Sequence, residues 1–167
     1  PVVPPTTGSE IRYTTSDGNQ IYLRTQCFNA SVASHEKQGN EWVITFNGTL
    51  TTIGNEGSST GAFENSGTLT SITIPDSVTK MYDYTFYECD KLQSVELSDS
   101  IELIGGMSFY TCTSLTEITL PASVKTIGGA TFYDCSNLST FNCYATTPPA
   151  LGDENVFTSD VTIYVPD

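Results

Sequence analysis

The sequence predicts an α/β solenoid with a β-rich N-terminal cap: a right-handed superhelix of β-α repeats, with a parallel sheet on one face and short helical or 3₁₀ turns on the other. Three observations predict this fold. One pattern occurs three times in succession between Leu69 and Asn137, and a fourth copy begins at Leu138. The period is constant at 23 residues, and apolar residues recur at the same positions of every copy. A fixed period of this length is typical of repeats that bury their apolar residues only against neighbouring repeats.

Each repeat is expected to begin with one strand. Two apolar columns lie two residues apart, which places both on one face of an extended chain. The columns are Ile72, Val95, Ile118 and Phe141, and Ile74, Leu97, Leu120 and Cys143. The residue between them in the first copy, Thr73, therefore points to the opposite face. Because the rest of each repeat returns the chain to its starting side, successive strands are expected to pair in parallel.

The second half of each repeat is expected to lie over the back of the core. A phenylalanine column and a cysteine column are three residues apart, a spacing that suits one turn of helix or 3₁₀ helix. Their members are Phe86, Phe109 and Phe132, and Cys89, Cys112 and Cys135. A serine column follows the strands and is expected to satisfy backbone groups of the turn. It consists of Ser77, Ser100 and Ser123.

The pattern L-x-x-I-x-I-P-x-S-V-x-x-I-G-x-x-x-F-x-x-C resembles the BspA-like leucine-rich repeats of bacterial surface proteins, and it covers Trp42 to Tyr144. The second copy departs from it at Ser98, where the other copies have proline, and the first copy has Tyr82 and Asp83 in place of paired glycines. The resemblance implies a leucine-rich-repeat solenoid located outside the cytoplasm. Such a protein is displayed on the cell surface, with lipid anchoring as a candidate mode of attachment, or secreted.

The segments that flank the repeats are expected to close the ends of the solenoid. A hairpin is predicted around Asp17-Gly18, with strands over 11–15 and 20–23, because glycine accepts a positive φ at such a turn. The expected segments are a Pro/Thr-rich linker (1–9), an N-terminal β-hairpin cap (10–40), the leucine-rich repeats (41–144) and a C-terminal capping segment with a final strand (145–167). The first repeat is degenerate. Its extra residues, within Asn55 to Gly61, are expected to form a surface loop that tolerates change or contacts a ligand.

The composition is strongly acidic, with 19 acidic against 6 basic residues and a formal net charge of −13. This charge makes nucleic acid and anionic membranes poor partners. The sequence contains no run of about 20 apolar residues, so no membrane span is predicted. These observations favour a module that binds proteins or neutral ligands.

Few residues are suited to catalysis or metal binding. His35 is the only histidine and has no flanking catalytic motif, and the sequence contains no phosphate-binding loop and no zinc-protease motif. The cysteine column is interpreted as small buried thiols, since a straight column does not offer tetrahedral ligation. Glu96 and Glu117 are a carboxylate pair such as a glycosidase requires, but an exposed sheet does not desolvate a catalytic acid. No enzyme activity, catalytic residue, metal site or cofactor is therefore predicted.

Two surface features are candidate ligand sites. They are the tyrosine column Tyr87, Tyr110 and Tyr133, and the polar sheet residues Glu96, Glu117 and Thr119. The tyrosines either bind a neutral glycan or a protein, or stack on one another and shield the back of the solenoid. The preferred hypothesis is a non-catalytic binding or adhesion module whose partner is a host matrix protein or another extracellular protein. The alternatives are a carbohydrate-binding accessory protein that uses the tyrosine column and a structural spacer, and the oligomeric state stays open.

Overall fold

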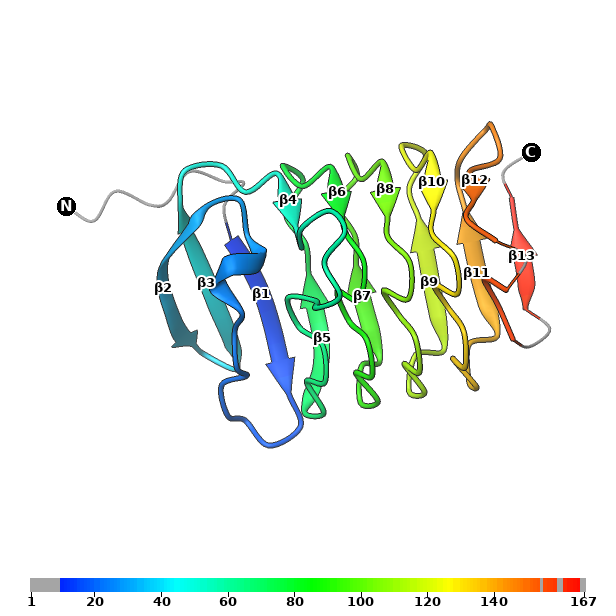
Figure 1. The fold of residues 1–167 in the computed structure, drawn as a ribbon. Coiled ribbons are helices and arrows are strands. Elements are labelled where there is room, and N and C mark those ends of the chain that lie inside the picture. Colours follow the sequence, from blue (N-terminus) through cyan, green and yellow to red (C-terminus); the bar gives the residue numbers. More distant parts are fainter. Residues whose placement is uncertain (1–9, 154, 159–160, 166–167) are drawn as a thin grey trace.

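The structure, a computed structural model, describes residues 10–153, 155–158 and 161–165, so the expected linker over 1–9 lies outside the described residues. Two rows of short parallel strands run along a solenoid, one on each side of a shared core (Figure 1). The front row consists of β5 (Leu69–Thr73), β7 (Ser94–Glu96), β9 (Glu117–Leu120), β11 (Thr140–Cys143) and β13 (Thr162–Tyr164). The second row consists of β4 (Thr52–Ile53), β6 (Lys80–Met81), β8 (Leu103–Ile104), β10 (Thr126–Ile127) and β12 (Ala150–Leu151). The predicted solenoid with parallel strands is confirmed.

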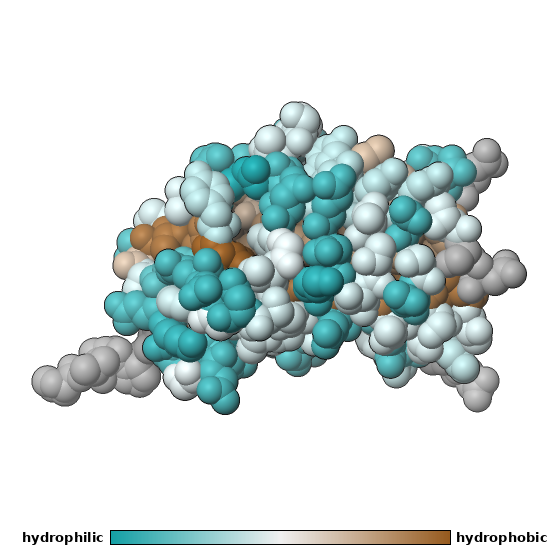
Figure 2. All heavy atoms as spheres, turned by 90° about the horizontal axis from the view of Figure 1, so that it is seen from below, coloured by the Kyte–Doolittle hydropathy of each residue, from teal (hydrophilic) through white to brown (hydrophobic). Residues whose placement is uncertain are grey.

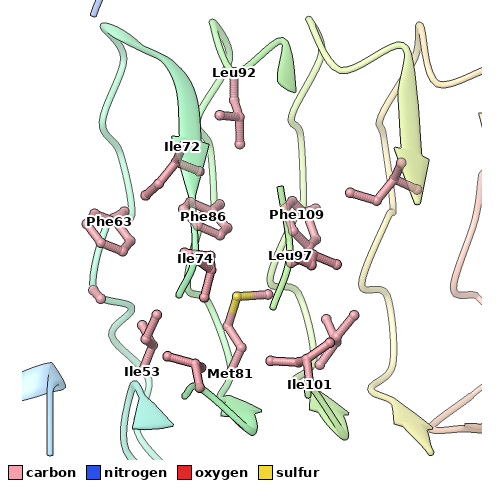
Figure 3. Packing of buried hydrophobic residues seen from close by; sticks show 14 of the residues in the cluster. Ile53, Phe63, Ile72, Ile74, Met81, Phe86, Leu92, Leu97, Ile101 and Phe109 are labelled. Atoms are coloured by element: carbon pink, nitrogen blue, oxygen red, sulfur yellow. The ribbon is translucent and has the colours of Figure 1, made fainter. Parts of the chain in front are cut away.

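The core between the two rows is built from the columns that the repeat predicts. Ile72 pairs with Val95 and Ile118 pairs with Phe141, so the apolar side chains of neighbouring front strands stack from rung to rung. The phenylalanines form a ladder of stacked rings, with centroids 5.2 to 5.5 Å apart, that consists of Phe63, Phe86, Phe109, Phe132 and Phe157. Figure 3 shows the first three rings of this phenylalanine ladder in one row, with Met81 beside them. The apolar columns therefore hold the rungs together as one continuous core.

The helical turns expected over the back of the core are not found. Among the described residues, the helical element is the 3₁₀ helix η1 (Thr25–Cys27), which lies in the N-terminal cap and not in a repeat. The back segments that contain β6, β8 and β10 each have a two-residue strand and then a turn in which non-glycine residues adopt positive φ angles, as Tyr84 (61°) and Glu88 (56°) do. The amide of Phe86 donates to the carbonyl oxygen of Ser108 on the next rung at 2.7 Å. Some amides of this segment therefore join neighbouring rungs, while that of Cys89 donates to the carbonyl oxygen of Phe86, three residues earlier, at 3.2 Å. The spacing of three residues thus corresponds to an isolated turn and not to a helix.

The predicted serine column is present in two of its three members. Ser77 Oγ donates to the carbonyl oxygen of Leu50 at 2.7 Å, and Ser123 Oγ donates to that of Ile101 at 2.7 Å. In the second copy the donor is Ser98, whose Oγ lies 2.7 Å from the carbonyl oxygen of Val78, while Ser100 is exposed. The residue that replaces proline in this copy has therefore taken over the role expected of Ser100.

The N-terminal cap is an antiparallel sheet that differs from the predicted hairpin. It contains β1 (Glu10–Thr15), β2 (Ser31–Gln38) and β3 (Glu41–Asn47). The turn at Asp17-Gly18 forms, with Gly18 at φ +70°, but residues 20–23 are not a strand. The hairpin of the cap is instead β2–β3, which turns at Gly39 with φ +65°. β1 lies between β3 and β5 and pairs antiparallel with both.

The degenerate first repeat keeps its back half in the stack and has its front half displaced. Ile53 of β4 pairs in parallel with Met81 of β6, and Phe63 stacks on Phe86, as the columns predict. In the front row, however, β1 separates β3 from β5, although β3 and β5 run in the same direction. The cap therefore joins the solenoid by inserting one strand between the first two rungs.

The loop over residues 55–61 is attached to the cap. Arg24 forms an ion pair with Glu64 at 2.8 Å, and its guanidinium also donates to the carbonyl oxygen of Gly61 at 3.4 Å. Asn55 Nδ2 donates to the carbonyl oxygen of Gln26 at 3.1 Å. These contacts give the inserted residues a structural role at the junction between cap and repeats.

Candidate binding surfaces

The front face carries the acidic candidates predicted from the sequence. Glu96, Glu117 and Thr119 are all exposed on this face of β7 and β9. Thr73 Oγ1 donates to Glu96 Oε2 at 3.2 Å, whereas Asn142 Nδ2 donates to Glu117 Oε1 at 2.6 Å and to Thr119 Oγ1 at 3.2 Å. The two carboxylates therefore share a face but are held by different neighbours.

No cation in the described part of the chain forms an ion pair with either front carboxylate. Lys125, which precedes β10 of the second row, is paired with Glu102 at 2.6 Å, and Arg12 is paired with Glu10 and Glu41 in the cap. A face of polar hydroxyls with unpaired carboxylates repels anions and attracts a cationic partner at low ionic strength.

The tyrosine column forms a second stack on the outside of the solenoid. The ring centroids of Tyr87 and Tyr110 lie 5.1 Å apart with the planes 15° from parallel, and those of Tyr110 and Tyr133 lie 5.3 Å apart at 8°. Tyr84 packs edge-on against Tyr87 at 5.5 Å. The stacking that the sequence left as one of two interpretations is therefore present.

Stacking leaves little of the tyrosine faces for a ligand. Both faces of Tyr110 are covered by its neighbours, whereas Tyr133, at the end of the column, is exposed. The Glu88 carboxylate raises the pKa of the Tyr87 phenol, so this hydroxyl stays protonated through neutral pH. Figure 2 views the molecule from below, onto the turns that precede the front strands, where the surface is mostly hydrophilic to neutral.

The structure adds a groove that the sequence analysis did not identify. It has a volume of about 550 Å³ and lies where the front strands end and the chain turns toward the second row. Its lining, called here the corner groove, includes Ile74, Asp76, Val95, Leu97, Asp99 and Tyr144. The sequence feature that could have indicated this groove is Ser98, next to Asp99, because Ser98 marks the corner at which this copy differs from the others.

The cysteine column lies in the core and makes no bridge. All five cysteines are free and buried. The thiols of Cys89, Cys112 and Cys135 donate to phenylalanine carbonyl oxygens of the preceding rung at 3.1, 3.2 and 2.9 Å. Burial raises the pKa of Cys89 and of Cys135 to about 12, which keeps these thiols protonated and unreactive. No group of metal-ligating side chains occurs among the described residues.

His35 is half-buried on β2, the edge strand of the cap. Its Nε2 lies 2.5 Å from the hydroxyl of Tyr13, which also accepts a hydrogen bond from the amide of Ile21 at 3.3 Å. Trp42 packs edge-on against the imidazole at 5.7 Å. Burial lowers the pKa of His35 and raises that of Tyr13 to about 12. The imidazole is therefore a neutral hydrogen-bond partner within the cap, and in the described part of the chain no serine or cysteine side chain is hydrogen-bonded to it.

The two parallel strand rows, the stacked phenylalanines and the open front face define a leucine-rich-repeat β-solenoid. The family model described as the BspA type leucine rich repeat region matches residues 56–157 with six copies. The chain belongs to the BspA-type leucine-rich repeat family, as the repeat pattern predicted.

A solved leucine-rich repeat protein from Bacteroides ovatus is similar to this chain at 25% sequence identity, with a TM-score of 0.45. The match covers 60% of this chain and 37% of that protein, so the chain spans well under half the length of this relative. No curated protein matches the chain. In the described residues, no helix has the length and apolar character needed to cross a membrane.

Proposed function

We propose that this chain is a non-catalytic binding module that acts outside the cytoplasm and binds an extracellular protein through its front face. The repeat solenoid is consistent with a protein-interaction module. Adhesion to a host matrix protein and attachment at the cell surface, by a lipid anchor or otherwise, are the more specific forms of this proposal.

The observation that carries the proposal is the exposure of the front face. Glu96, Glu117 and Thr119 are exposed, while Ile118 and Leu120, which alternate with the latter two on β9, are buried in the stack. The strands are therefore held rigidly from behind and present an ordered row of polar groups at the front. A rigid surface loses little conformational entropy when an extended partner binds to it.

The glycan alternative is less well supported. Aromatic rings bind sugars through their faces, and in the tyrosine column the faces of Tyr110 are already covered by Tyr87 and Tyr133. Stacking thus accounts for the covered ring faces of the column without a ligand, and Tyr133 at its end stays exposed. A structural spacer remains the third hypothesis and predicts no binding at all.

An array of matrix proteins and neutral glycans tests the proposal directly. The wild-type chain is compared with a front variant, Glu96→Gln with Glu117→Gln, and with a column variant in which Tyr87, Tyr110 and Tyr133 are changed to alanine. We expect a protein hit that weakens in the front variant and as salt rises, and that survives in the folded column variant. A glycan hit lost in the column variant would overturn the proposal in favour of the carbohydrate-binding alternative, and no hit would favour the spacer.

A further inference from the structure

The front row of the solenoid is interrupted between β7 and β9. β7 is the last strand of one hydrogen-bonded sheet, and β9 is the edge of another. Gln93 N–H donates to the carbonyl oxygen of Thr70 at 2.9 Å, and Ser139 N–H donates to that of Thr116 at 3.1 Å. The equivalent amide between β7 and β9, that of Thr116, makes no such bond in the described structure. The ladder of the front row is thus missing at this step, whereas the second row continues through it, since β8 pairs with β10.

The corners beside this interruption differ from rung to rung. Tyr144 N–H donates to the carbonyl oxygen of Leu120 at 3.0 Å. One rung earlier the equivalent position is Pro121, which has no N–H, and the amide of Ser98, one further rung back, makes no such bond in the described structure. In the same rung Ser98 takes over the corner hydrogen bond that the other copies make with a later serine. The β7 rung is therefore the one whose corner departs from the pattern.

The corner groove lies at this interruption and has an apolar floor. Ile74 and Leu97 are buried beneath it, and Val95, which faces the core column, is only half-buried. Pro121 lines one side, and Tyr144 lines it with 53% of its surface exposed. The groove takes its lining from four successive rungs, which at about 4.8 Å per rung span about 14 Å, or about four residues of an extended chain.

The rim of the corner groove is acidic. Asp76, Glu96 and Asp99 line it, and none of its lining residues is basic. Asp76 Oδ1 accepts a hydrogen bond from the amide of Asp99 at 3.2 Å, and no ion pair in the described part of the chain neutralises any of the three carboxylates. An apolar floor with an acidic rim is complementary to an extended segment that alternates apolar and basic side chains.

We propose that the corner groove binds an extended basic peptide segment of the partner, with apolar side chains on the floor and lysine or arginine side chains at Asp76, Glu96 and Asp99. This inference rests on the proposed function and names where on the solenoid the partner binds. Alternation suits the site because apolar side chains of such a segment face the floor, while the long aliphatic stems of lysine or arginine reach the rim.

The test uses an acetylated, fluorescein-labelled hexapeptide of three Lys-Val repeats as the probe. Its binding to the purified chain is measured by fluorescence anisotropy at low and at physiological salt. The groove variant is Asp76→Asn with Asp99→Asn, in which the asparagine oxygen at position 76 keeps an acceptor for the amide of residue 99. The matched control, Glu88→Gln with Asp134→Asn, changes the net charge equally but lies away from the groove on the exposed turns of the back.

We expect saturable binding that weakens about fivefold in the groove variant and less than twofold in the control, since two exposed ion pairs are lost only in the first. A Lys-Ser hexapeptide of the same charge is expected to bind at least fivefold more weakly, because it lacks apolar side chains for the floor. Tyr144→Ala, at an exposed wall, is expected to weaken the Lys-Val probe without changing the circular dichroism spectrum.

Three results would overturn the groove proposal. They are the absence of saturable binding, equal weakening in the groove variant and the control, and equal affinity for the Lys-Ser peptide. If the array identifies a protein partner whose binding is lost in the front variant but unchanged in the groove variant, the proposed function stands and the groove proposal fails. If the array finds no protein partner while the probe still binds in the groove, the groove is a peptide site and the proposed function fails.

Discussion

Replacing Phe109 with leucine should lower the free energy of unfolding by about 1 to 3 kcal/mol. The ring is fully buried and stacks between Phe86 and Phe132, with centroids 5.2 Å from each. Leucine keeps most of the apolar volume but loses both ring contacts, each worth about 0.5 to 1.5 kcal/mol beyond the buried area. Because each rung is stabilised by its neighbours, a loss in the middle of the phenylalanine ladder weakens the interfaces on both sides of one rung.

The assay is urea denaturation at neutral pH, followed by circular dichroism and by tyrosine and tryptophan fluorescence. Coincident transitions by the two probes justify the extraction of one free energy of unfolding. The matched control is Tyr110→Leu, which removes a ring that also stacks on two neighbours, at 5.1 and 5.3 Å, but is only half-buried. Its cost should stay below about 1 kcal/mol because water replaces part of the lost contact. If Phe109→Leu costs no more than Tyr110→Leu, buried stacking is not what holds the rungs together.

Three further predictions concern close packing, pH and thiol reactivity. Gly128→Ala places a Cβ 2.2 Å from the backbone nitrogen of Gly106, so it should destabilise the chain by at least about 2 kcal/mol in the same urea assay; a cost under about 0.5 kcal/mol would contradict the close approach of these rungs. Because burial lowers the pKa of His35, the unfolded chain binds a proton below about pH 6.5 that the folded chain does not, and stability should fall as the pH drops through this range. His35→Gln should reduce this fall between pH 7 and 5.5, and an unchanged pH dependence would show that the imidazole does not titrate differently on folding. All five cysteines are buried, and burial raises the pKa of Cys112 well above its ordinary value. A colorimetric thiol reagent should therefore label no cysteine in the native chain and all five in denaturant. Fast labelling of the native chain would show that the core opens.

The repeat predicted the columns of the core because every copy repeats the same burial at the same position. Knowing that Phe86 and Phe109 occupy one column is enough to place them in contact once the rungs stack in parallel. The same logic predicts that Tyr87 and Tyr110 are neighbours, and it leaves open only whether they stack or bind a ligand. The candidate residues of the front face were predictable for the same reason, since strand alternation fixes which side chains face outward.

The cap was harder to predict because its pairing is not local. The turn at Asp17-Gly18 was identified from its own residues, but β1 pairs with β3 and β5 instead of with the residues that follow the turn. Such long-range pairing leaves no periodic signal in the sequence. The prediction for the back turns failed for another reason. Tyr84 and Glu88 adopt positive φ angles although they are not glycine, so their residue types do not indicate this conformation.

The irregular positions of the repeat are the ones that carry the binding hypotheses. Where the copies agree, each side chain finds its packing or hydrogen-bond partner on a neighbouring rung. Rings stack on rings, as in the tyrosine column, and thiols donate to carbonyl groups of the preceding rung. At Ser98 the agreement breaks, the front strand ladder ends beside it at β7, and Val95 is left half-buried at the floor of a groove. A partner can cover this half-buried side chain and form ion pairs with the carboxylates that have none. A partner of this solenoid should therefore bind at the departures from its repeat.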